Sequence, residues 1–357
     1  MSAPGAADTT LGPWRTARLC SAAFVAALGC LAGACLLGVL AGPADLDSLS
    51  VVLEILDRAP LVAVTSSLSE REAAILWELR VPRVIVGGLV GATLAVAGTA
   101  YQGVFRNPLS DPYLLGVAAG AGLGATLAVA YLPRGGWWPI DPLPLAAFAG
   151  ALIAVACTYA LATSGRHART MTTLILAGVA VAAFFTAAQT FVQQRDVEDL
   201  REVYAWLLGT LGTAGWQQAA LLTPYAAGSL VVIWLHRRLL DVMSVGDEEA
   251  GSLGVDAKRV RLIVVVAASL ATAAAVAVSG LIGFVGIIVP HALRLLVGPS
   301  YRTLVPLALV LGAAFLILAD ILARTIMAPA ELPIGVITAF MGAPFFLVVL
   351  RTTKRLA

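Results

Sequence analysis

Charged residues are missing from nine long stretches of this 357-residue chain, and these stretches restrict its fold more than any other feature. The uncharged intervals are 17 to 34 residues long and fall between residues 18 and 351. An α-helix needs about 20 apolar residues to cross the roughly 30 Å hydrocarbon core of a membrane. The intervals therefore predict an all-α polytopic membrane protein and exclude a soluble globular fold. They also exclude a membrane β-barrel, whose strands alternate polar and apolar residues over about ten positions.

The intervals predict about ten transmembrane helices. The interval of 32 residues must hold two of them, because a single helix of that length would measure about 48 Å, and Ser279, Gly280 and Gly283 supply the break. The interval of 34 residues begins with 204–215, whose three glycines favour an interfacial or re-entrant piece. The expected spans are 19–42, 84–105, 113–133, 143–163, 171–194, 216–236, 262–279, 281–297, 304–323 and 333–350.

The orientation of the helices follows from the basic residues, which are retained on the cytoplasmic side of a membrane. With the N-terminus inside, the inner segments hold 15 Lys and Arg against seven Asp and Glu, and the outer segments hold eight against 13. Both termini are therefore expected in the cytoplasm. Residues 1–18 are interpreted as a cytoplasmic tail and 19–42 as a membrane helix, because 24 residues exceed the apolar core of a cleavable signal. We expect residues 1–357 to form a single transmembrane domain.

The low charge of the spans also limits the function of the chain. Intramembrane enzymes and ion-driven carriers need ionisable residues inside their spans, and only Asp320 lies within one. The sequence contains no GxxxxGK[ST] phosphate loop, so ATP hydrolysis would need a separate protein. We expect a transport protein without catalytic residues, metal ligands or bound cofactors, with ATP and Mg held by a partner ATPase. A secondary carrier or channel that works without ATP is the rival class.

One inner loop, residues 240–258, has the composition of a docking surface for such an ATPase. The acids 247–249 follow Gly246, where negative charge favours a helix N-terminus. Gly254 can end this helix in the left-handed conformation, and Asp256 can cap the helix that follows. The loop therefore predicts a short amphipathic helix on the inner membrane face. An ordinary capped loop that keeps basic residues inside is the alternative.

Several longer motifs resemble a known family. The stretches 79–124 (LRVPR to GAGLG), 278–298 (VSGLIGFVGIIVPHALRLLVG) and 318–351 (LADILAR to FFLVVLR) resemble the FecCD-type permeases, as does the inner loop SVGDEEAGSLGV. These permeases are the membrane subunits of ABC importers for ferric siderophores, haem and cobalamin. The outer loop 43–78 is long for this family.

The resemblance implies a single permease domain of the type II ABC importer architecture, located in the inner membrane and surrounded by lipid. It implies a homodimer, two copies of an ABC ATPase subunit below it, and a periplasmic or lipid-anchored substrate-binding protein above it; no nucleic acid is involved. The expected cargo is an iron complex, either a ferric siderophore or haem. Cobalamin is the alternative cargo.

The resemblance also implies roles for particular residues. Coupling to the ATPase falls on Gly246, Asp247, Glu248, Glu249, Gly251, Leu253 and Gly254. The cytoplasmic gate falls on Asn107 and Leu109, with Met171 and Thr172 opposite. Docking of the binding protein falls on Arg80, Arg83 and Arg324.

Each of these roles has a structural alternative. Arg80 and Arg83 could anchor to lipid headgroups, and Arg324 could pair with Asp320 four residues earlier. Asn107 could serve only to cap the third helix. Four glycines are expected to allow close helix packing rather than to contact a substrate. They are Gly91, Gly98, Gly120 and Gly124.

Overall fold

The ten predicted spans are confirmed in a computed structural model that describes residues 13–44, 46–58, 66–132, 141–164, 171–195 and 200–353. Seven helices in this part of the chain are long and apolar enough to cross a membrane, and three shorter apolar helices complete the set. The ten helices are α1 (Pro13–Leu40), α4 (Val81–Phe105), α5 (Val117–Tyr131), α6 (Pro142–Thr163), α7 (Met171–Arg195), α9 (Trp216–Met243), α11 (Ala257–Ser279), α12 (Val285–Val297), α13 (Tyr301–Thr325) and α14 (Ile334–Thr353).

The shorter elements lie in the connections between these helices. The long outer loop contains α2 (Ser48–Asp57) and α3 (Glu70–Ala74), and a π-helical segment, Ile75–Arg80, joins α3 to α4. The piece expected at 204–215 contains the end of α8 (Leu200–Leu207), and α10 (Asp247–Ser252) lies in the inner loop. Of the predicted N-terminal tail, residues 1–12 lie outside the described residues, and 13–18 belong to the first turns of α1.

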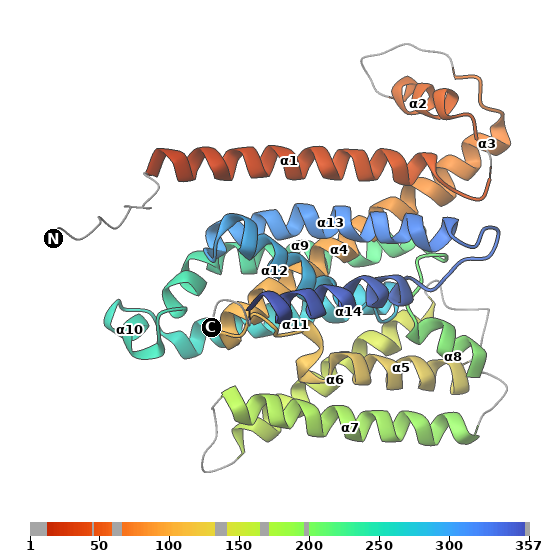
Figure 1. The fold of residues 1–357 in the computed structure, drawn as a ribbon. Helices are drawn as coiled ribbons and strands as arrows, with labels where there is room; N and C mark the ends of the chain where they lie inside the picture. The colour runs from red at the N-terminus through yellow and green to blue at the C-terminus, as the bar shows by residue number, and fades with distance from the viewer. Residues whose placement is uncertain are drawn as a thin grey trace.

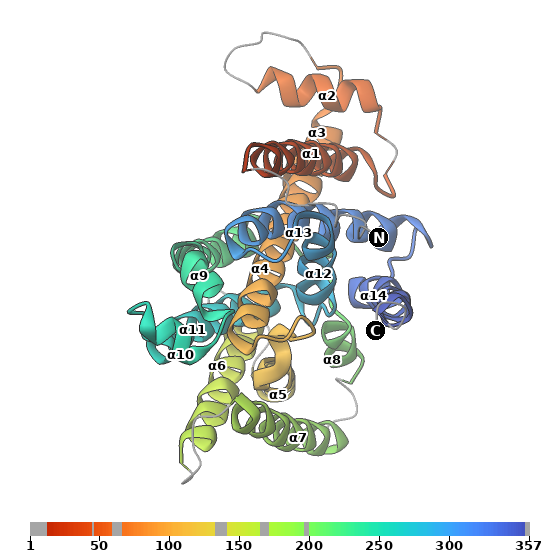
Figure 2. The ribbon, with the colours of Figure 1, turned by 60° about the vertical axis from the view of Figure 1, so that its left-hand side comes forward.

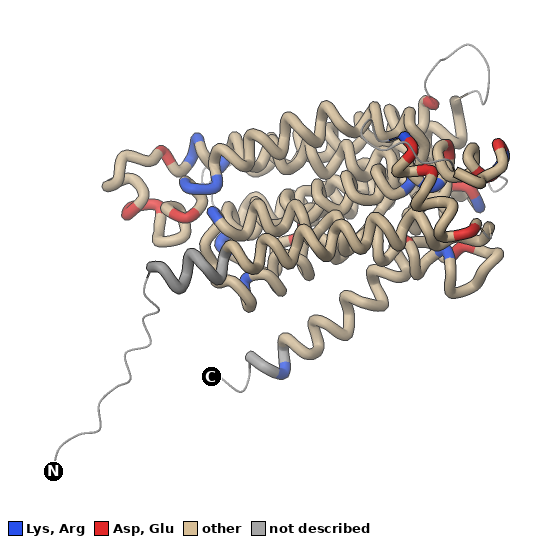
Figure 3. The backbone as a smooth tube through the Cα atoms, turned by 90° about the horizontal axis from the view of Figure 1, so that it is seen from above, with Lys and Arg blue, Asp and Glu red and all other residues tan. Residues whose placement is uncertain are grey.

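The charged residues gather at the two ends of the helix bundle (Figure 3). We call the end that carries α10 the inner end and the end that carries α2, α3 and α8 the outer end (Figure 1). Helix α1 begins and α14 ends at the inner end (Figure 1). Among the described residues, this arrangement agrees with cytoplasmic termini.

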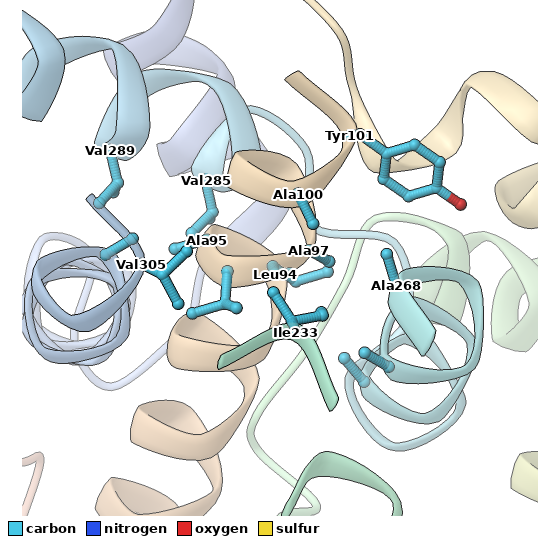
Figure 4. Packing of buried hydrophobic residues seen from close by; sticks show 14 of the residues in the cluster. Leu94, Ala95, Ala97, Ala100, Tyr101, Ile233, Ala268, Val285, Val289 and Val305 are labelled. Atoms are coloured by element: carbon cyan, nitrogen blue, oxygen red, sulfur yellow. The ribbon is translucent and has the colours of Figure 1, made fainter. Parts of the chain in front are cut away.

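Helix α4 forms the centre of the bundle. It is surrounded by α9, α11, α12 and α13, with α1 at one edge of the molecule and α7 at the other (Figure 2). Small and β-branched side chains fill the space between these helices (Figure 4). Most of α4 is buried, which explains why its residues are apolar on every side.

Four glycines bring neighbouring helices into backbone contact, as predicted. A Cβ atom on Gly98 would lie 1.9 Å from the carbonyl oxygen of Gly286 in α12, and one on Gly91 would lie 2.2 Å from the carbonyl oxygen of Gly312 in α13. Gly120 and Gly124 of α5 approach the carbonyl oxygens of α6 in the same way. Atoms cannot pack at such distances, so these positions require glycine.

The predicted break in the 32-residue interval lies between Ser279 and Val285. The residue before α12, Phe284, has a φ of 69°, a left-handed conformation that bulky side chains rarely adopt. The hydroxyl group of Tyr113 accepts a hydrogen bond from the Ile282 N–H at 3.1 Å and donates one to the Ile282 carbonyl oxygen at 2.9 Å. Backbone groups without a helical partner inside a membrane protein are stabilised by such bonds.

Candidate functional site

The inner loop forms the short helix that the sequence predicts. Gly246 precedes it, α10 runs from Asp247 to Ser252, and Gly254 follows with a φ of 79°. The carboxylate of Asp256 accepts hydrogen bonds from the backbone N–H groups of Lys258 at 3.0 Å and Arg259 at 3.1 Å, and so caps α11. These caps fix the direction of α10 between two membrane helices.

One side of α10 is open to the cytoplasm. Ala250 is fully buried and anchors the helix, whereas Glu248, Glu249, Gly251 and Leu253 are exposed. Leu253 is 69% exposed, and Val245 just before the helix is 68% exposed. Acidic and apolar side chains together make a surface that suits a protein partner with basic and apolar residues. Sequence reasoning missed Val245, although an apolar residue next to three acids could have identified it.

Asp247 differs from its two acidic neighbours because it is bound within the chain. Its carboxylate pairs with Arg106 at the end of α4 and with Arg261 of α11, the latter at 2.9 Å. Partial burial raises the pKa of this carboxyl, but the hydrogen bond from Arg261 and the charges of Arg261, Arg106 and Lys258 lower it below its ordinary value. Asp247 is therefore ionised at neutral pH and joins α10 to two membrane helices.

The Asn-Pro-Leu turn follows α4 at the inner end. The side-chain oxygen of Asn107 accepts a hydrogen bond from the Leu109 N–H at 3.0 Å, and its carbonyl oxygen accepts one from the Ser110 N–H at 3.1 Å. Asn107 thus closes its own turn and does not cap the next helix, which was the structural alternative. The side chain of Leu109 is 47% exposed, so it is available to contact another part of a gate.

The opposite side of the predicted gate lies at the start of α7. This helix begins at Met171, whose side chain lies outside the described residues, and Thr172 in its first turn is exposed. Two turns further on, a Cβ atom on Gly178 would lie 2.1 Å from the Leu114 carbonyl oxygen. Helix α7 therefore touches the segment that follows the Asn-Pro-Leu turn, while the pairing of Met171 and Thr172 with that turn stays a prediction.

Asp111, which the sequence did not single out, caps the 3-10 helix Pro112–Leu115 by accepting a hydrogen bond from the Tyr113 N–H at 2.7 Å. Burial disfavours its charged form and raises its pKa to about 6, and the bond from Tyr113 offsets only part of this effect. A carboxyl whose pKa is higher in the folded state binds its proton more tightly there. The chain therefore loses stability as the pH rises from about 4 to 6.

Replacing Asp111 by asparagine is expected to remove this pH dependence, because asparagine keeps an acceptor oxygen without the charge. The stability gained by Asp111→Asn relative to wild type should be larger at pH 8 than at pH 5 by about 1 kcal/mol, roughly the free energy of one pKa unit. Thermal unfolding of both purified proteins at the two pH values measures this difference. A gain of equal size at both pH values would contradict the raised pKa.

The arginines predicted to dock a binding protein lie at the outer end, but they are bound within the chain. Arg80 is 5% exposed and donates to the carbonyl oxygens of Val39 at 2.9 Å and Leu40 at 2.7 Å. Arg324 is 2% exposed and donates to the carbonyl oxygen of Gly38 at 2.6 Å. The last carbonyl groups of a helix lack partners within it, so these two side chains hold the end of α1.

Arg83 joins the same group of residues from another side. Its guanidinium group binds Asp320 at 2.8 Å and Glu331 at 2.8 Å, and Asp320 also pairs with Arg324 at 3.4 Å. The pair of Arg324 with Asp320, one of the two alternatives, is therefore present. For Arg80 and Arg83 the alternative was an anchor to lipid headgroups, but their guanidinium groups bind the end of α1 and the carboxylates of Asp320 and Glu331 instead. Docking on these arginines stays a prediction, and it would require these internal bonds to be exchanged.

No group of three or more His, Cys, Asp or Glu side chains in the described part of the chain could hold a metal ion. The inner end thus presents a short, partly exposed helix that an ion pair joins to the end of α4, and the outer end presents an internal charge network.

Comparison with known proteins identifies the family. Residues 29–352 match the FecCD transport family. The cobalamin import system permease protein BtuC of Halobacterium salinarum is 43% identical over 282 residues, which cover 79% of this chain and 74% of that protein. The hemin transport system permease protein HmuU of Yersinia pestis is 38% identical over 76% of this chain and 82% of that protein.

A solved structure of a metal-chelate type ABC transporter in an inward-facing conformation has the same fold. It superimposes with a TM-score of 0.78 at 27% identity and covers 93% of this chain and 99% of that one. The two relatives are permease proteins of import and transport systems, and the solved structure is that of an ABC transporter. The chain is therefore a multi-pass permease of the inner membrane and belongs to the FecCD transport family.

Proposed function

We propose that two copies of this chain form one transport pathway, that two ABC ATPase subunits dock on the two α10 helices, and that a substrate-binding protein delivers the cargo at the outer end. The exposed acidic and apolar side of α10 carries this proposal. A short capped helix at the inner end, anchored by Ala250 and open to the cytoplasm, is suited to receive the movement of a partner protein.

The cargo that we propose is a bulky metal chelate, with an iron complex such as a ferric siderophore or haem as the first candidate. The hemin permease of Yersinia pestis supports an iron complex, and the cobalamin permease of Halobacterium salinarum supports cobalamin as the second candidate. The spans are almost free of charge, so their walls would bind such a cargo weakly. Weak binding favours passage, because a permease that holds its cargo tightly releases it slowly.

The single chain exposes apolar side chains that a second copy could cover. Phe184 of α7 and Phe340 of α14 are 72% and 75% exposed, and both helices belong to the described part of the bundle. Lipid or another copy must cover such surfaces. A mass measurement of the purified complex should give two permease chains and two ATPase chains, and a ratio of one to two would contradict the homodimer.

Uptake into vesicles tests the cargo. The chain is reconstituted with its ATPase and binding protein, and each vesicle preparation receives a labelled ferric siderophore, labelled haem or labelled cobalamin. We expect ATP-dependent uptake of an iron complex. Uptake of cobalamin alone would assign the second candidate, and uptake that continues without the ATPase would contradict the proposed function as a whole.

Reversing the charge of the α10 surface should prevent docking of the ATPase. In Glu248→Lys/Glu249→Lys, two exposed carboxylates become cations that would repel a basic partner surface. Like charges across an interface cost several kcal/mol, so affinity should fall by about 100-fold or more. Co-purification of the ATPase and ATP-dependent uptake measure the effect.

The matched control makes the same charge change at the opposite end of the molecule. Asp57 and Glu70 are exposed at the outer end, and Asp57→Lys/Glu70→Lys should keep the ATPase bound. If the two double variants co-purify equal amounts of ATPase, α10 is not the docking surface.

A further inference from the structure

Asp247 connects α10 to the two membrane helices that flank the candidate coupling and gate regions. Arg106 donates a hydrogen bond from Nη2 to Oδ1 of Asp247. Arg261 donates from its own Nη2 to Oδ1 at 3.1 Å and to Oδ2 at 2.9 Å. The contact with Arg261 is local, since this residue lies in the second turn of α11, the helix that follows α10. The contact with Arg106 reaches 141 residues back along the chain.

Arg106 is rigidly joined to the Asn-Pro-Leu turn. It ends α4 in a left-handed conformation, with a φ of 48° and a ψ of 34°. Its backbone N–H donates hydrogen bonds to the carbonyl oxygens of Gln102 and Gly103. The backbone N–H of Asn107 donates one to the carbonyl oxygen of Gln102 at 3.2 Å. A residue other than glycine seldom adopts this conformation unless its surroundings fix it. A movement of the Arg106 side chain is therefore transmitted directly to the turn that contains Asn107 and Leu109.

The same turn is in contact with α7 through the 3-10 helix that follows it. Asp111 caps this helix, and the Leu115 carbonyl oxygen accepts a hydrogen bond from the Thr158 hydroxyl of α6 at 3.0 Å. The Leu114 carbonyl oxygen lies so close to Gly178 of α7 that no side chain fits between them. Close-packed backbone contacts of this kind transmit displacement instead of absorbing it.

These contacts form a continuous path from α10 to the Asn-Pro-Leu turn and on to Gly178 of α7. We propose that the ion pair between Asp247 and Arg106 is the link through which movement of α10 shifts the Asn-Pro-Leu turn, and that Arg106 is a positioning residue for transport. The inference rests on the proposed coupling role of α10. It adds a residue, Arg106, and a path that leads from the docking surface to the turn and on to α7.

The exposure of the pair suggests that it serves coupling more than folding. The side chains of Arg106 and Asp247 are 38% and 45% exposed, and ion pairs with such access to water contribute little to stability. Arg261 continues to hold Asp247 when Arg106 is changed, so α10 keeps its attachment to α11. Replacement of Arg106 should therefore leave α10 and its docking surface in place. It should remove only the connection between α10 and the Asn-Pro-Leu turn.

The test uses the complete complex of permease, ATPase and binding protein in vesicles. In Arg106→Gln we expect a normal amount of bound ATPase and normal basal ATP hydrolysis. Uptake of cargo per ATP hydrolysed should fall by about tenfold, within the usual range of coupling free energies. Arg106→Lys keeps the positive charge and should recover a large part of the uptake.

A double-mutant cycle and a charge control complete the experiment. If the two residues act as one link, Arg106→Gln/Asp247→Asn should be no worse than Asp247→Asn alone, which also loses the pair with Arg261. Arg259 is another exposed cation at the inner end. Its side chain forms no ion pair in the described part of the chain. Arg259→Gln should therefore transport like the wild type.

The outcomes separate this inference from the proposed function. If wild type binds the ATPase and transports, but Arg106→Gln couples ATP hydrolysis to uptake as well as wild type does, the link is wrong and the proposed function remains. If Arg106→Gln loses the ATPase, Arg106 is a docking residue and the link is also wrong. If wild type itself binds no ATPase, the proposed function fails first.

Discussion

Gly98→Val is expected to abolish the folded protein. A Cβ atom at this position would lie 1.9 Å from the carbonyl oxygen of Gly286 and 2.5 Å from its Cα atom. Both are backbone atoms, so they cannot rotate away as a side chain can. Helices α4 and α12 would have to separate at the centre of the bundle, where interior packing leaves no space to absorb the change. The loss of stability should exceed about 4 kcal/mol, which is exceptional for a single substitution.

The measurement is the amount of monodisperse protein after membrane extraction, followed by thermal unfolding of whatever is recovered. Gly29→Val is the matched control, because Gly29 lies in the middle of another membrane helix, α1, and nothing lies within 4 Å of a Cβ atom there. We expect the control to behave like wild type and Gly98→Val to yield no monodisperse protein. Recovery of Gly98→Val with a normal unfolding temperature would show that the contact between α4 and α12 is not required.

The spans were predictable because the physical constraint on them is strong and local. A charged side chain in hydrocarbon is costly, so the chain confines its charges to the two ends. Each uncharged interval therefore records one crossing, except the interval of 32 residues, which records two. The observed helices differ from the predicted spans mainly at their ends. Interfacial residues extend several of them, whereas α5 and α12 begin four residues later than predicted, after the 3-10 helix and the break that precede them. Helix α9, for example, continues to Met243 and includes Arg237 and Arg238, whose long side chains can reach polar surroundings.

The local caps of the inner loop were predictable for the same reason. Gly254 and Asp256 act on backbone groups two or three residues away, so residue type and spacing are sufficient. The partner of Asp247 was not predictable. Three consecutive acids look alike in the sequence, but only the first is directed toward Arg106, which lies 141 residues earlier.

The outer arginines show the same limit. Their spacing predicts that Arg80 and Arg83 lie near each other at the outer end, and it gives no information about carbonyl groups at the end of α1 or about an acid 237 residues further along. Only the packing of α1, α4 and α13 brings these groups together. The resemblance to FecCD permeases implied docking for these arginines, while the described contacts give their guanidinium groups internal partners.

Asp320→Ala is expected to destabilise the outer end strongly. The carboxylate of Asp320 is almost completely buried, with a side-chain exposure of 3%, and it pairs with both Arg83 and Arg324. Its removal leaves the buried guanidinium group of Arg324 without the carboxylate that it pairs with, and it leaves Arg83 with Glu331 alone. Removing one partner of a buried ion pair typically costs about 3–5 kcal/mol, because the remaining charge stays out of water. Thermal unfolding of the purified variant should show a correspondingly large decrease.

Glu331→Ala is the control that isolates the effect of burial, because Glu331 also pairs with Arg83 at 2.8 Å but keeps a side-chain exposure of 34%. A partly exposed pair contributes about 0–1 kcal/mol, so this variant should unfold close to the wild-type temperature. Equal losses in the two variants would show that the pairs are equivalent and that burial does not decide their strength. A large loss confined to Asp320→Ala would mean that the arginines hold α1, α4 and α13 together through this carboxylate. A binding protein that docks on them would then also act on the packing of the central helix.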